Sequence, residues 1–175
     1  MEKRRPGMGL NLATSAKNYC QELLHFHCWR QETICKLLTE LDSQVFSREL
    51  SGSFGSLYII CKHLVWAEKV WLGRVNHDEM ATMREMDVLG MIEEWKSVTA
   101  KWTAELEKRE EEGFQSPIEY FNSTGTRYEN TLFEIVVHMI DHSTYHIGQM
   151  MNAVRGFGID PVSTNYIHYL RATKS

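Results

Sequence analysis

The segment HMIDHSTYHIGQ, residues 138–149, is the most informative part of this sequence. It contains no proline, and its three histidines, His138, His142 and His146, recur every four residues. On an α-helix a step of four residues advances only about 40°, so side chains at this spacing lie one above another on a single face. Two imidazoles placed in this way can bind one metal ion, as in helical zinc motifs with histidines at i and i+4.

The composition indicates a globular protein of one domain. The chain has 175 residues, of which 43% are hydrophobic and 24% charged, and its net charge is −4. This acidic balance gives no support to nucleic-acid binding, and no apolar run approaches the ~20 residues needed to span a bilayer. We therefore predict one domain over residues 12–175, with neither nucleic acid nor a membrane as a partner, preceded by a disordered lead at residues 1–11.

The cysteines indicate a reducing compartment. Cys20, Cys28 and Cys35 fall on one predicted helix, too far apart along its axis to pair, and Cys61 falls on the next helix. None has the CxxC spacing of a cysteine-based zinc site. Because the N-terminus also lacks the pattern of a signal peptide, we predict buried, reduced thiols in a cytoplasmic protein.

Hydrophobic periodicity predicts four amphipathic helices. Their ranges are 12–41, 54–75, 88–112 and 131–155, with a loop at 42–53 and a last helical turn at 165–170. Between the third and fourth helices, two short runs on either side of Ser-Thr-Gly predict a β-hairpin. The predicted fold class is all-α, a four-helix bundle with a short β-hairpin before the last long helix.

Histidines occupy the inward stripe of three of these helices: His27 on the first, His63 on the second, and His142 with His146 on the fourth. Burying two neutral imidazoles one turn apart requires partners for four ring nitrogens, and a shared divalent ion satisfies two of them. His63 can complete a set of three, which leaves one coordination position open for water or substrate, as in catalytic zinc sites. His138 lies beside the stripe and is interpreted as a flanking residue, although His138 with His142 is the competing ligand pair.

Three further polar residues are candidates for the site. His27 and Gln31 occupy consecutive inward positions of the first helix, where an unsatisfied buried polar group costs about 1–3 kcal/mol. We expect them to line the site cavity; the alternative is that they bond to each other or to another helix. Gln149 lies on the stripe of the fourth helix and can orient a ligand or a substrate. Glu68, about 140° around its helix from His63, is interpreted as an ion-pair residue on the outer face.

Several motifs connect the sequence to a known family. They are SFGSL at 53–57, HLVWAEKVWL at 63–72, GTRY at 125–128 and HSTYHIGQ at 142–149. With these motifs the chain resembles the DinB family, the YfiT-like metal-dependent enzymes, over nearly its whole length after residue 12. The resemblance implies a four-helix bundle, a homodimer, and a divalent metal ion on His63, His142 and His146.

The resemblance also implies a chemistry, because family members of known activity include transferases that use low-molecular-weight thiols. Ile147 stands where the family usually has Arg, and Asn165 replaces the acid of the family's threonine-aspartate-tyrosine pattern. We predict an enzyme that uses zinc, nickel, manganese or iron to activate a thiol for S-transfer to a small electrophile, or water for hydrolysis. The alternative is a non-catalytic metal-binding protein, a stress-response or dimeric partner-binding module.

Overall fold

A computed structural model describes residues 15–50, 55–78 and 81–173. The predicted lead at 1–11 lies outside these residues. The helices are α1 (Ala16–Glu40), α2 (Ser43–Ser47), α3 (Leu57–Asn76), α4 (Val88–Glu107), α5 (Leu132–Gly156) and α6 (Tyr166–Thr173), with a 3-10 turn η1 (Glu111–Phe114) and the strands β1 (Pro117–Phe121) and β2 (Arg127–Thr131).

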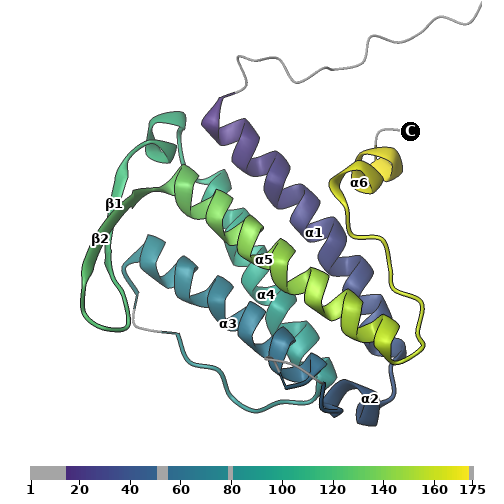
Figure 1. Cartoon of the computed structure of the whole chain (residues 1–175). Helices are drawn as coiled ribbons and strands as arrows, with labels where there is room; N and C mark the ends of the chain where they lie inside the picture. Colours follow the sequence, from purple (N-terminus) through teal and green to yellow (C-terminus); the bar gives the residue numbers. More distant parts are fainter. Residues whose placement is uncertain (1–14, 51–54, 79–80, 174–175) are drawn as a thin grey trace, which may run out of the picture.

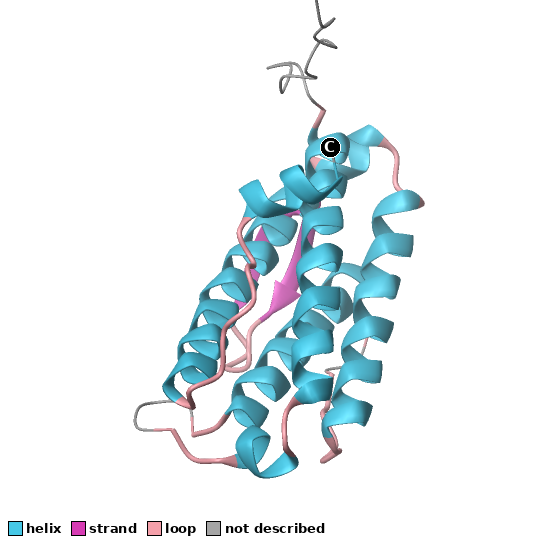
Figure 2. Cartoon of the chain, turned by 90° about the vertical axis from the view of Figure 1, so that its right-hand side faces the viewer, coloured by secondary structure: helices cyan, strands magenta, loops and turns pink. Residues whose placement is uncertain are grey.

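The four long helices α1, α3, α4 and α5 form the bundle (Figures 1 and 2). Each packs against two of the others, in the cyclic order α1, α4, α3, α5. The interior contains the fully buried indoles of Trp95 and Trp102 on α4 and the aliphatic side chains of the neighbouring helices. The predicted fold class, a four-helix bundle with a hairpin before the last long helix, is confirmed.

The hairpin leads directly into α5. Its antiparallel strands pair Tyr120 with Tyr128, and Gly125 in the turn has a φ of 78°, which favours glycine. The ring of Tyr120 lies 5.2 Å from that of Trp71, so the hairpin rests on α3. Thr131, the last residue of β2, caps α5 through a reciprocal capping box with Glu134. The chain therefore enters α5 in a fixed register.

The connections differ from the sequence prediction in two places. The predicted loop at 42–53 contains α2, which Asp42 caps by accepting a hydrogen bond from the Gln44 amide. The third helix ends at Glu107 instead of residue 112, and η1 follows it. The reason is Phe114 on η1, which is completely buried and pulls the chain back onto the bundle. None of the helices in the described ranges is long and apolar enough to cross a bilayer.

Candidate metal centre

Three histidine side chains from two helices converge within the bundle. His63 lies on α3, and His142 and His146 lie one turn apart on α5. Nε2 of His142 lies 3.3 Å from Nε2 of His63 and 3.1 Å from Nε2 of His146. One candidate ligand atom from each residue lies within 4.8 Å of the other two. The structure thus brings together the three histidines that the sequence predicts as metal ligands.

The spacing of the nitrogens suits a single ion. Nitrogens bound to tetrahedral zinc at ~2.0–2.1 Å lie about 3.3 Å from one another, close to the 3.3 and 3.1 Å that separate Nε2 of His142 from those of His63 and His146. A neutral imidazole has one N–H and one lone pair, so three converging nitrogens cannot all satisfy one another. The donor set therefore fits a divalent transition metal ion.

The electrostatics of the cluster keep the imidazoles of His63 and His142 neutral. Burial, followed by the proximity of His146, His63 and His138, lowers the pKa of His142 to about 4. Burial and the proximity of His146 also lower the pKa of His63. Metal ions bind the neutral imidazole, so at neutral pH these two ligands need not lose a proton before they bind an ion.

Gln149 determines which nitrogen of His146 faces the cluster. Its Oε1 lies 2.8 Å from Nδ1 of His146, and since an amide oxygen only accepts, Nδ1 must carry the proton. The lone pair of His146 then lies on Nε2, which points at His142. This is the arrangement by which outer hydrogen bonds fix the tautomer of metal-binding histidines.

His138 lies outside the convergent set. Its side chain is exposed, and its ring lies edge-on to that of Trp71, with centroids 4.9 Å apart, and 6.0 Å from that of His142. Among the residues that the structure describes, the group able to hold an ion consists of His63, His142 and His146 without it. Of the two ligand pairs weighed from the sequence, His142 with His146 is the one that converges with His63.

Exposed apolar side chains flank the cluster on the solvent side and form its rim. His63 and His142 are half-buried, so the site is accessible from outside the bundle. Ile59, one turn before His63, is 45% exposed, Trp66 is 37% exposed with its ring 5.9 Å from that of His63, and Tyr145 is 62% exposed with its ring 5.1 Å from that of His146. Exposed apolar side chains gathered in this way are typical of a binding surface.

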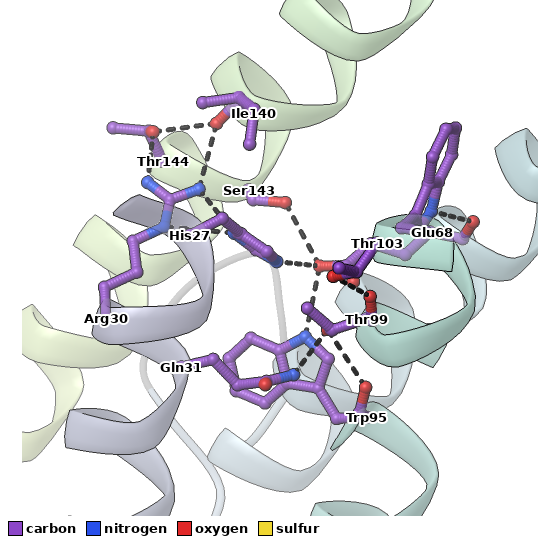
Figure 3. A network of polar contacts seen from close by, with 11 residues as sticks. His27, Arg30, Gln31, Glu68, Trp95, Thr99, Thr103, Ile140, Ser143 and Thr144 are labelled. Atoms are coloured by element: carbon purple, nitrogen blue, oxygen red, sulfur yellow. Dashed lines mark hydrogen bonds and ion pairs between the residues drawn. The ribbon is translucent and has the colours of Figure 1, made fainter. Parts of the chain in front are cut away.

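Glu68 was predicted as an ion-pair residue on the outer face, and the outer position is wrong. Its side chain is 1% exposed, and its Oε1 accepts hydrogen bonds from Trp95 Nε1 at 3.1 Å and Ser143 Oγ at 3.3 Å (Figure 3). Nε2 of His27 lies 2.9 Å from the same oxygen, although the ring N–H is poorly aligned for a strong hydrogen bond. Because α3 packs against both α4 and α5, its buried arc is wide enough to enclose Glu68 as well as His63.

His27 and Gln31 belong to this second network. Nδ1 of His27 accepts a hydrogen bond from Arg30 Nε at 3.1 Å, so the neutral ring carries its proton on Nε2, toward Glu68. Gln31 donates to Thr99 Oγ1 at 2.6 Å. Gln31 thus follows the alternative stated from the sequence and bonds to another helix, whereas His27 accepts from Arg30 on its own helix and contacts Glu68 on α3. Neither residue belongs to the three-histidine cluster.

A buried guanidinium completes the network. Arg30 is fully buried and donates to Thr144 Oγ1 at 2.6 Å and to the Ile140 carbonyl at 3.2 Å (Figure 3). Burial lowers its pKa to about 10, against the opposing effect of Glu68, so it stays charged at neutral pH. The chain Arg30–His27–Glu68 is therefore an ion pair bridged by a neutral imidazole. Arg30 was not among the residues predicted from the sequence, although its position one turn from His27 was an available signal.

The fold and the convergent histidines define the class of this protein, a helical bundle with a candidate metal centre between two helices. The sequence model of the DinB family matches residues 13–175, and the chain belongs to this family. Protein DinB of Bacillus subtilis (strain 168) is 23% identical over 167 residues, which cover 90% of this chain and 97% of that protein.

Two crystal structures share the fold. A DinB-like protein from Bacillus cereus ATCC 10987 superposes with a TM-score of 0.63 at 18% identity, covering 81% of this chain and 94% of that one. A DinB family member from Shewanella denitrificans superposes with a TM-score of 0.53 at 17% identity, covering 85% and 84%.

Two departures from the family pattern have a structural setting. Ile147 is 2% exposed and packs in the hydrophobic core, where an arginine would be buried. Asn165 is exposed and precedes α6, and its carbonyl accepts a hydrogen bond from the His168 amide. Neither position contributes a side chain to the three-histidine set.

Proposed function

We propose that this protein binds a divalent transition metal ion through Nε2 of His63, His142 and His146 and is a metal-dependent enzyme. The observation that carries the proposal is the approach of three ligand nitrogens from α3 and α5, with neighbouring pairs 3.1 and 3.3 Å apart. Three neutral ligands leave a coordination position for a reactant, which distinguishes catalytic from structural zinc sites.

The proposed reaction is S-transfer from a low-molecular-weight thiol to a small electrophile, or hydrolysis. A bound divalent ion supplies Lewis acidity, which favours the thiolate of a thiol or the hydroxide of water at neutral pH. The protein's own residues supply the rest: Gln149 orients His146, and the rim of Ile59, Trp66 and Tyr145 shields one side of the reactants from water.

The first experiment measures metal stoichiometry in four single variants, each with one histidine changed to Ala. We expect H63A, H142A and H146A to emerge from dialysis nearly metal-free, because two imidazoles hold a divalent ion weakly. H138A is the matched control, since His138 is a neighbouring histidine outside the convergent set, and it should stay loaded. A loaded H146A with an empty H138A would refute the ligand assignment.

The second experiment tests turnover with a panel of thiols and a chromogenic electrophile, and with an activated ester. Activity should disappear on chelation and return with zinc, nickel, manganese or iron. Activity that survives complete metal removal would contradict the proposed mechanism, and a loaded protein without turnover would favour the non-catalytic alternative. The homodimer and the cytoplasmic location stay predictions, the first of which sedimentation at micromolar concentration can test.

A further inference from the structure

A pocket of about 410 Å³ lies between α3 and the β-hairpin, and one of its lining residues, Trp66, also neighbours His63 of the three-histidine cluster. The side chains that matter for its chemistry are Trp66, Val70, Arg74, Asp78, Glu119 and Tyr120. Its volume lies within the usual range for sites that bind small molecules. The hairpin, which the sequence predicted without a role, forms one wall of this pocket.

The pocket lies on the same side of α3 as His63. Trp66, Val70 and Arg74 follow His63 at helical spacing, so all four side chains fall within an arc of about 80°. Trp66 stands between the pocket and the cluster, with its ring 5.9 Å from that of His63 and its Nε1 donating to the Ala81 carbonyl at 3.1 Å. A molecule in the pocket can therefore extend along α3 past Trp66 to the histidines.

Arg74 is the polar group best placed to select a ligand. Its guanidinium carbon lies 4.3 Å from the centroid of the Trp71 ring and 4.9 Å from that of Tyr120, so two aromatic rings hold it. Within the described part of the chain, no carboxylate pairs with it and no hydrogen bond uses its N–H groups. A held planar guanidinium with its donors available is suited to bidentate binding of a carboxylate.

The acidic residues of the pocket do not neutralise Arg74. Glu119 is exposed and forms an ion pair with Arg127 on the opposite strand. Asp78 is exposed just beyond the end of α3. Arg74, in contrast, is half-buried beside the aromatic rings, where screening by solvent is weaker. The interior of the pocket is therefore its cationic part.

We propose that this pocket binds the carboxylate-bearing end of an elongated small molecule, with Arg74 binding the carboxylate and the remainder lying over Trp66 toward the three-histidine cluster. That this molecule is a substrate rests on the proposed function; its binding at Arg74 does not. With this pocket the site gains a specificity, because Arg74 favours thiols or electrophiles that carry a carboxylate over neutral ones of the same size.

The test compares two probes of one shape, 4-phenylbutyrate and 4-phenylbutyramide, by calorimetric titration of the full-length protein. Wild type should bind the acid at least about tenfold more tightly than the amide, as expected for charge-assisted hydrogen bonds. R74M should bind both equally, and R74K should recover part of the preference. R155M is the matched control, because Arg155 is exposed on α5 away from the pocket and its loss should leave the preference unchanged.

Repeating the titration after chelation separates this proposal from the metal site. The preference for the acid should survive, since Arg74 and not an ion produces it. Equal binding of the two probes by wild type, a preference retained in R74M, or a preference lost on chelation would each overturn the proposal. A protein that prefers the acid but has no turnover would leave the pocket standing and refute the proposed enzyme activity alone.

Discussion

Replacing Glu68 by Ala should destabilise the protein more than any surface change of charge. The substitution leaves Trp95 Nε1 and Ser143 Oγ without the acceptor they share, and it removes the oxygen that lies 2.9 Å from His27 Nε2. It also leaves the guanidinium of Arg30, fully buried, without a counterion. Removing one partner of a buried ion pair costs about 3–5 kcal/mol, a range that two orphaned donors at about 1–3 kcal/mol each make reasonable.

This loss is large enough to measure by thermal unfolding. A domain of this size loses about 2–4 °C in Tm for each kcal/mol, so E68A should melt roughly 6–20 °C below wild type. Circular dichroism and scanning calorimetry can record the shift. E119A is the matched control, because Glu119 pairs with Arg127 on the exposed hairpin and its loss should leave Tm close to that of wild type.

Two further variants test the reason as well as the size. E68Q keeps an oxygen for the two donors, Trp95 Nε1 and Ser143 Oγ, but removes the charge, so it should lose less stability than E68A. The double variant R30M/E68L should be more stable than R30M alone or E68L alone, because it removes both buried charges together. Two results would contradict a buried ion pair between Arg30 and Glu68. One is a loss of less than about 1 kcal/mol of unfolding free energy in E68A, and the other is a loss in the double variant equal to the sum of the losses in R30M and E68L.

The remaining predictions concern the ligand shell, the helix cap and the thiols. Q149L should weaken metal binding by about 10–100-fold, because the proton on His146 Nδ1 loses its acceptor, and a competition titration against a chromophoric chelator measures this. T131A should cost about 1 kcal/mol of unfolding free energy in urea, since Glu134 loses its capping partner. At pH 8 the native thiols should react slowly with a disulfide reagent, and Cys28 should react fastest because it is half-buried and the other three are buried. Burial raises the pKa of the Cys28 thiol, so this thiol also stays mainly protonated at pH 8 and reacts slowly. Four rapidly reacting thiols, an unchanged affinity in Q149L, or a stabilised T131A would contradict the respective argument.

The three-histidine cluster could be predicted because it depends mainly on residue spacing within α5 and on one inward position on α3. His142 and His146 share a face through the fixed rise and twist of one helix, and His63 needed only an inward position on a neighbouring helix. The structure confirms the fold and the convergence of these residues. The hairpin was equally local, since its two runs and the turn at Gly125 form one continuous stretch.

The buried network could not be predicted from the same kind of argument. If each helix had a single inward stripe, Glu68 would lie on the outer face of α3. However, α3 contacts both α4 and α5, so it has a second buried side that includes Glu68. The partners of His27 and Gln31 lie on other helices, at Glu68 and Thr99, and sequence spacing carries no information on which helices are neighbours. The requirement that these polar residues be compensated was foreseeable, whereas the compensating residues were not.

His142 and Ser143 are consecutive on α5, yet one belongs to the histidine cluster and the other bonds to Glu68. On α3, His63 likewise faces the histidine cluster, whereas Glu68 accepts the hydrogen bond from Ser143. A rotation of α5 about its axis would therefore break a contact on each side at once, so the two contacts act together as a rotational lock on the helix pair. A designer who transferred only the three histidines to another bundle would reproduce the ligand atoms without that lock. The helix could then rotate about its axis, and the three nitrogens would no longer converge.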